Sequence, residues 1–101
     1  MSEIKCAAIR YERILEDGSR RTEVQIGPNH YYISEMIYDM EIKADRNSYE
    51  YGFVDEFNHY YDRRQAFEIA YQHDQLTDTY KNFNNTGCLE SYMLKKKENK
   101  E

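Results

Sequence analysis

The chain of 101 residues has no tryptophan, one proline, four glycines and two cysteines. Its glycines are scattered, which excludes a glycine-rich phosphate loop. No apolar run is long enough to span a bilayer, and residues 1 to 15 lack the uninterrupted apolar segment of a signal peptide. We therefore expect a cytoplasmic protein with no membrane partner.

Candidate residues for metal or covalent chemistry are few. Cys6 and Cys88 are far apart in the sequence, so reduced thiols are expected in the cytoplasm. The histidines His30, His59 and His73 share no metal-ligand spacing, and a zinc site needs three or four converging ligands. No nucleophile stands beside an evident base. We expect no catalytic residue, no metal and no cofactor, and the protein is not expected to be an enzyme.

Charge and aromatic content are the positive features of the composition. The net charge of -5 disfavours nonspecific binding to nucleic acid or to anionic membranes, but it permits a small anion in a locally basic pocket. Eleven tyrosines suit interfaces and stacking on purines, or simply fill ordinary strand positions. Because a core of this size is modest, association with further copies would bury more surface, and a homo-oligomer is expected.

The first half of the chain predicts a hairpin followed by a helix. Strands are expected at Ile4 to Tyr11 and Arg20 to Ile26, joined by the turn signal Asp17-Gly18. Gly27-Pro28 ends the second strand and starts a helix. The core stripe of this helix is predicted to be Ile33, Met36, Ile37 and Met40, and the polar residues Lys43 to Ser48 are expected to form a loop.

The central stretch from Tyr51 to Leu76 predicts a second hairpin feeding a second helix. The short strands are Gly52 to Val54 and His59 to Tyr61, and Asp62 with Gln65 forms a variant capping box. The buried face of the helix is predicted to contain Ala66, Phe67, Ala70 and Tyr71.

The remainder predicts one weak helical turn at Thr77 to Phe83, a loop at Asn82 to Gly87 and a short strand or ordered hook at Leu89 to Leu94. The fold class is therefore α+β, with a small antiparallel sheet of about four strands packed against two helices. Residues 1–94 form one domain, and residues 95–101 are predicted to be a charged, disordered tail.

The central stretch resembles a family of small bacteriophage proteins. The matching residues are Gly52-Phe53-Val54, then Tyr60, Asp62, Arg63, Gln65 and Ala66, then Ile69, Ala70 and Gln75. Gln65 stands where the family usually has glutamate, and Asp74 where it usually has glycine. The resemblance extends to the Thoeris anti-defence sponges, homo-oligomers that sequester cyclic ADP-ribose-type signals and, in some cases, cyclic oligonucleotides. It implies a non-enzymatic anti-defence protein in the host cytoplasm during infection.

A ligand site is expected where the second hairpin meets its helix. Arg63 and Arg64 lie at the helix start, where the macrodipole and free amides favour a phosphate, although an ion pair with a nearby carboxylate is the structural alternative. Adjacent Tyr60 and Tyr61 must face opposite sides of the sheet. The ligand-binding residues implied by the sponge hypothesis are Arg63, Arg64, Phe53, Tyr60, Tyr61, His30 and Asn82, with Asn84 and Asn85 also near ribose hydroxyls.

A second hypothesis comes from the acidic charge. The chain could be an inhibitor that binds a host defence or nucleic-acid-processing protein directly, in the manner of an anti-CRISPR protein or a nucleic-acid mimic. Its carboxylates would then matter more than its arginines, namely Asp55, Glu56, Asp62, Glu35, Asp39 and Glu41. His30 either packs locally or faces a ligand at a subunit junction. A structural phage protein without a small ligand is the third possibility.

Overall fold

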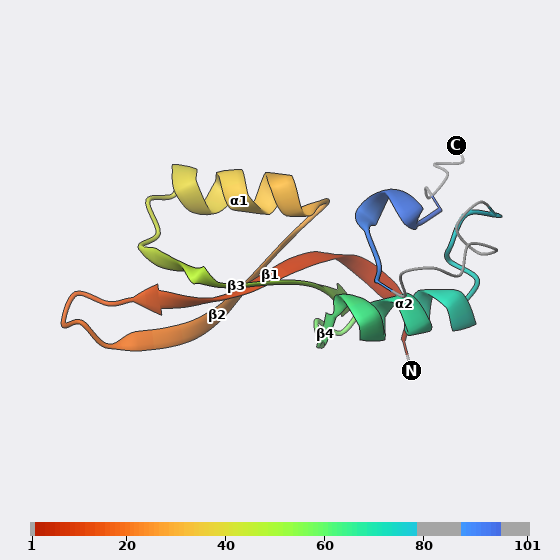
Figure 1. The fold of residues 1–101 in the computed structure, drawn as a ribbon, viewed down its shortest axis with the longest axis horizontal. Helices are drawn as coiled ribbons and strands as arrows, with labels where there is room; N and C mark the ends of the chain where they lie inside the picture. Colours follow the sequence, from red (N-terminus) through yellow and green to blue (C-terminus); the bar gives the residue numbers. More distant parts are fainter. Residues whose placement is uncertain (1, 79–87, 96–101) are drawn as a thin grey trace.

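A computed structural model of the chain describes residues 2–78 and 88–95. Four strands form one antiparallel sheet in the order β2-β1-β3-β4. The strands are β1 (Ile4–Ile14), β2 (Arg20–Gly27), β3 (Ala44–Asp55) and β4 (Tyr60–Asp62). The helices are α1 (His30–Asp39) and α2 (Arg63–Gln72), with a 3₁₀ turn, η1, at Ser91–Met93. The predicted α+β class is confirmed, and α1 and α2 lie at opposite ends of an elongated molecule (Figure 1).

The first hairpin turns at Asp17-Gly18, as predicted. Gly18 has a φ of 87°, and its amide donates to the Leu15 carbonyl at 2.9 Å. The Asp17 carboxylate accepts from the amide of Ser19 at 2.9 Å. Both contacts are local, which is why the dipeptide predicts the turn.

The polar segment Lys43 to Ser48 was predicted to be a loop, and this is wrong because β3 begins at Ala44. The register with β1 shifts between the pairs Arg10↔Glu50 and Glu12↔Asp45, so this end of β3 is irregular. The Ser48 hydroxyl accepts from the Glu12 amide at 2.8 Å, and Asp45 pairs with Arg20 at 2.7 Å. Polar side chains thus hold the strand at a partly exposed end of the sheet.

Helix α1 begins at His30, where Asn29 caps it by accepting from the Tyr32 amide at 2.8 Å. Ile33 and Ile37 are buried as predicted. The placement of Met40 in the core is wrong, because the helix ends at Asp39 and Met40 is 59% exposed.

Helix α2 begins with the predicted capping box. The Asp62 carboxylate accepts from the Gln65 amide at 2.8 Å, and the Gln65 side chain accepts from the Asp62 amide at 3.1 Å. Ala66 and Ala70 are buried as predicted, but Tyr71 is exposed. Ile69 is buried instead, so the buried face of α2 does not include Tyr71.

One cluster of buried side chains joins the sheet, both helices and the C-terminal segment. Leu89 and Met93 belong to it, and Leu94 forms a bridge with Leu76, so residues 88–95 form the ordered hook. Most of the weak turn predicted at Thr77 to Phe83, the loop predicted at Asn82 to Gly87 and nearly all of the predicted tail lie outside the described residues. No helix within residues 2–78 and 88–95 is long and apolar enough to cross a membrane.

Candidate functional site

Arg63 is engaged by its own chain. Its Nη1 lies 2.5 Å from Oε2 of Glu90 in the C-terminal segment, and its carbonyl accepts from the Leu89 amide at 2.9 Å. The ion pair that was the structural alternative is therefore present. Glu90 therefore offsets the charge of this guanidinium at the helix start.

Two predicted ligand contacts, Phe53 and His30, bind each other instead. Phe53 is fully buried, so its assignment as a stacking surface for a ligand is corrected to a core position. The rings of Phe53 and His30 meet edge to face with centroids 5.1 Å apart. His30 Nε2 lies 2.8 Å from the Gly52 carbonyl, which only accepts, so this nitrogen carries the proton. The contact fastens the start of α1 to β3.

Tyr60 and Tyr61 face opposite sides of the sheet, as expected from the alternation of strand residues. Tyr61 packs against the core, and its hydroxyl donates to Asp55 at 3.0 Å. That hydrogen bond raises the pKa of Tyr61. On the other side, the guanidinium of Arg10 lies over the Tyr60 ring, 4.6 Å from its centroid. Burial raises the pKa of Tyr60 to about 12. Both rings already have intramolecular partners.

Of the two other predicted contacts, only Arg64 can be placed. It is exposed on α2 and has no carboxylate partner among the described residues. Asn82, like Asn84 and Asn85, lies outside the described residues. The structure therefore does not bring the predicted set together around one ligand position.

Asp55 is the polar centre of the β3–β4 connection, and it was predicted to be a surface carboxylate. It is only 1% exposed, which corrects that prediction. Its carboxylate accepts from the amides of Phe57 and His59 at 2.9 Å, from the Tyr61 hydroxyl, and pairs with Nδ1 of His59 at 3.1 Å. Burial opposes the charge of Asp55, but these hydrogen bonds outweigh it and lower the pKa to about 2.

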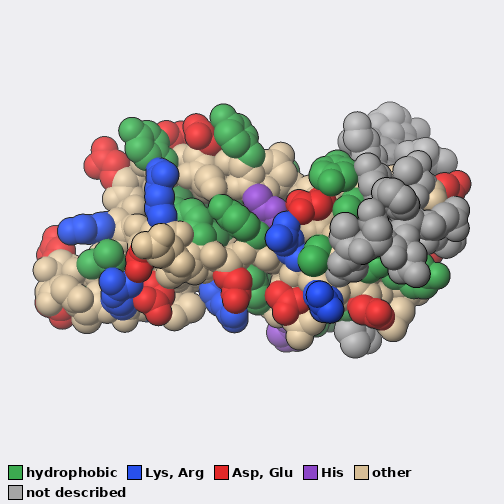
Figure 2. All heavy atoms as spheres, viewed as in Figure 1, with side chains coloured by type: hydrophobic (Ala, Val, Ile, Leu, Met, Phe, Trp, Pro, Cys, Tyr) green, Lys and Arg blue, Asp and Glu red, His purple; other side chains and the backbone are tan. Residues whose placement is uncertain are grey.

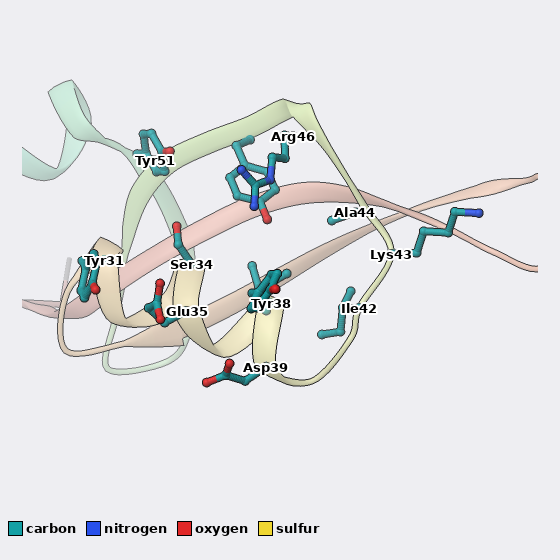
Figure 3. A pocket seen from close by; sticks show the side chains of 12 residues that line it. Tyr31, Ser34, Glu35, Tyr38, Asp39, Ile42, Lys43, Ala44, Arg46 and Tyr51 are labelled. Carbon is teal, nitrogen blue, oxygen red and sulfur yellow. The ribbon is translucent and has the colours of Figure 1, made fainter.

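A hollow of about 670 Å³ lies elsewhere, between α1 and β3, and we call it the tyrosine groove. Its volume falls within the range of about 300–1,000 Å³ that is usual for small-molecule sites. The groove is lined by Tyr31, Ser34, Glu35, Ile37, Tyr38, Asp39, Ile42, Lys43, Ala44, Arg46, Tyr49 and Tyr51. Figure 3 shows Tyr31, Glu35 and Tyr38 projecting from α1 on one side, and Tyr51 and Arg46 from β3 on the other.

Arg46 is the cation that reaches into the groove, whereas Lys43 points away from it (Figure 3). Arg46 has no carboxylate partner among the described residues. Most other arginines do pair with carboxylates: Arg10, Arg13, Arg20, Arg21 and Arg63. An unpaired guanidinium beside aromatic faces is suited to an anion that carries a ring.

Sequence reasoning missed the groove because it placed Arg46 in a loop. The irregular register of β3 brings Arg46 and Tyr49 to the same hollow, where both residues lie across from α1. The available signal was the recurrence of Tyr49 and Tyr51 two residues apart, which is the spacing of one strand face. The Tyr49 and Tyr51 rings lie 6.4 Å apart, nearly perpendicular.

Fold and groove together define a small α+β protein with an open aromatic groove. Within residues 2–78 and 88–95, no three histidine, cysteine or acidic side chains are grouped so as to hold a metal ion. The family model described as phage T4 y16D protein matches residues 3–94, so the chain belongs to this bacteriophage protein family. No curated protein and no solved structure matches the chain.

Proposed function

We propose that this phage protein binds and sequesters a small nucleotide-type ligand in the tyrosine groove, without turning it over. The observation that carries the proposal is the guanidinium of Arg46, which has no carboxylate partner within residues 2–78 and 88–95 and lies in a hollow with four tyrosines. The sequence resemblance to Thoeris anti-defence sponges supports the class of ligand, a cyclic ADP-ribose-like molecule or a cyclic oligonucleotide.

The groove supplies the contacts that such a ligand needs. The Arg46 fork binds phosphate through two parallel N–H bonds, and the exposed faces of Tyr38 and Tyr51 accept a base by stacking. The carboxylates of Glu35 and Asp39, on the α1 side, accept hydrogen bonds from ribose hydroxyls. Because the same carboxylates repel a chain of phosphates, the groove favours a compact ligand with few negative charges over a long nucleic acid.

Arg46→Ala is expected to weaken nucleotide binding while leaving the fold intact, because the side chain is exposed and forms no described ion pair. Loss of a charge-assisted contact of roughly 1.5–3 kcal/mol corresponds to a dissociation constant about tenfold to a hundredfold higher. Thermal-shift and calorimetric titrations with cyclic ADP-ribose isomers and cyclic dinucleotides measure the effect, since a ligand of the native state raises the melting temperature.

Arg64→Ala is the matched control, because it removes another exposed guanidinium that has no carboxylate partner in the described part of the chain and lies outside the groove. It should bind as tightly as the unmodified protein. If no nucleotide raises the melting temperature at saturating concentration, the proposal fails. If Arg64→Ala loses binding and Arg46→Ala does not, the ligand is held at the start of α2 instead.

Direct binding of a host protein is the second candidate, and the outer side of α1 favours it. Tyr32 and Met40 are 53% and 59% exposed on α1, and neither residue lines the tyrosine groove. Figure 2 shows hydrophobic and acidic side chains side by side over this helix. Tyrosine and methionine are enriched at protein-binding surfaces. Activity in infected cells that is lost in Tyr32→Ala but kept in Arg46→Ala would favour this candidate.

A further inference from the structure

The strand β2 forms one edge of the sheet, since β1 is its only neighbour in the strand order (Figure 1). The register of the hairpin determines which backbone groups of β2 form hydrogen bonds to β1. The Leu15 amide donates to the Ser19 carbonyl at 2.8 Å, which places the odd-numbered residues of β1 in the bonds to β2. The amides of Glu12 and Ile14 confirm this alternation, because both donate toward β3.

The pairing of β1 with β2 therefore uses the backbone of Arg21, Glu23 and Gln25, and the amides and carbonyls of Thr22, Val24 and Ile26 point outward. No backbone partner for these outward groups is found in the described part of the chain. The strand contains no proline and no lysine, and its charged residues Arg20, Arg21 and Glu23 restrict pairing to a partner with complementary charge. Val24, an apolar residue of β2, is 40% exposed.

We propose that β2 pairs with β2 of a second copy of this chain, antiparallel and about a two-fold axis at Thr22. Residues whose backbone groups point outward must pair with residues of the same kind in the second copy. The two-fold axis can therefore pass through Thr22, Glu23 or Val24. An axis at Glu23 would set two carboxylates directly opposite each other, which is unfavourable. An axis at Val24 leaves Glu23 opposite Gln25.

With the axis at Thr22, the charged side chains of the two copies are complementary. It sets Arg21 opposite the partner's Glu23, and Glu23 opposite the partner's Arg21, in the closely spaced pairs of the ladder. Arg21 lies 2.5 Å from its own Glu23, and its side chain is still 58% exposed, so it is free to meet a second carboxylate. The four charges then alternate in sign around the axis.

The pairing would join two four-stranded sheets into one. A two-fold axis perpendicular to the sheet keeps both copies of α1 on the same side, so both tyrosine grooves would open on one face of the dimer. The inference concerns a surface separate from the groove, and it stands whether or not the groove binds a nucleotide.

A charge-swap experiment tests the dimer in trans. Arg21→Glu and Glu23→Arg each place like charges opposite each other in a homodimer, so each variant alone is expected to dimerise about tenfold more weakly than the unmodified protein. An equimolar mixture should recover a heterodimer, because the acidic pair of one chain meets the basic pair of the other. Sedimentation of each variant and of the mixture gives the result, and circular dichroism of each variant verifies the fold.

The in-chain contact between positions 21 and 23 is disrupted in both variants, so only pairing between chains explains recovery in the mixture. Cysteine cross-linking checks the register: Thr22→Cys should link two chains under oxidation, whereas Val24→Cys should not. A strictly monomeric unmodified protein at about 100 μM would overturn the dimer. Cross-linking of Val24→Cys but not Thr22→Cys would overturn the axis at Thr22.

Discussion

Replacing Asp55 with asparagine is expected to lower the melting temperature by roughly 10 °C. One carboxylate oxygen accepts from the Phe57 and His59 amides, and the other from the Tyr61 hydroxyl and the His59 ring. Asparagine offers one acceptor, and its NH₂ group would face donors. Because Asp55 is buried, water cannot replace the lost contacts.

The same contacts give the protein a defined acid response. The pKa of Asp55 falls from 3.8 to about 2 on folding, so its stabilising effect is complete above the unfolded value. It is lost as the pH falls from about 4 toward 2, where the folded carboxylate takes up a proton. Melting temperatures measured across this window should decline steeply for the unmodified protein and less steeply for Asp55→Asn.

Glu56→Gln is the control for both measurements, because it neutralises the adjacent, exposed carboxylate without breaking any of these hydrogen bonds. Its melting temperature should stay close to that of the unmodified protein at neutral pH. Parallel pH profiles for Asp55→Asn and the unmodified protein would show that the acid response has another source.

Short-range sequence signals predicted the parts of the fold that depend on neighbouring residues. The Asp17-Gly18 turn and the Asp62–Gln65 capping box each close within a few residues, so their chemistry is readable along the chain. The start of β3 was missed because its polar residues resemble a loop. They form a strand only because Glu12 and Arg20, far away in the sequence, supply partners to Ser48 and Asp45.

The described members of the predicted ligand site do not line one hollow, and the reason is again tertiary contact. A guanidinium at a helix start predicts an anion, and the anion at Arg63 is Glu90, a residue 27 positions away. No local pattern specifies that contact. The tyrosine groove likewise requires α1 to lie against an irregular part of β3, and both conditions arise from tertiary packing. The sequence could predict the residue types of a ligand site, but not the residues that already have partners.

Gly52→Ala is expected to have the largest effect of all, a fall in the melting temperature of roughly 20 °C. A Cβ atom at this position would overlap the backbone carbonyl oxygen of Tyr61 and come within 2.5 Å of the Tyr60 ring and hydroxyl. Overpacking of this kind costs about 3 kcal/mol or more when the obstacle is backbone, a large share of the stability of a small domain. The Gly52 carbonyl also accepts from His30, so displacement of β3 would release α1.

Two comparison variants isolate the cause. Gly18→Ala places a side chain at a φ of 87° with nothing within 4 Å, so it should cost only about 1–2 kcal/mol through backbone strain. Gly52→Ala combined with Tyr60→Ala removes the ring from the Cβ path and leaves the Tyr61 carbonyl in place. If the carbonyl is the decisive obstacle, the double variant melts at least as early as Gly52→Ala, as followed by circular dichroism. A double variant that melts at a higher temperature than Gly52→Ala would assign the constraint to the ring. A Gly52→Ala protein as stable as Gly18→Ala would show that β4 can move away from β3.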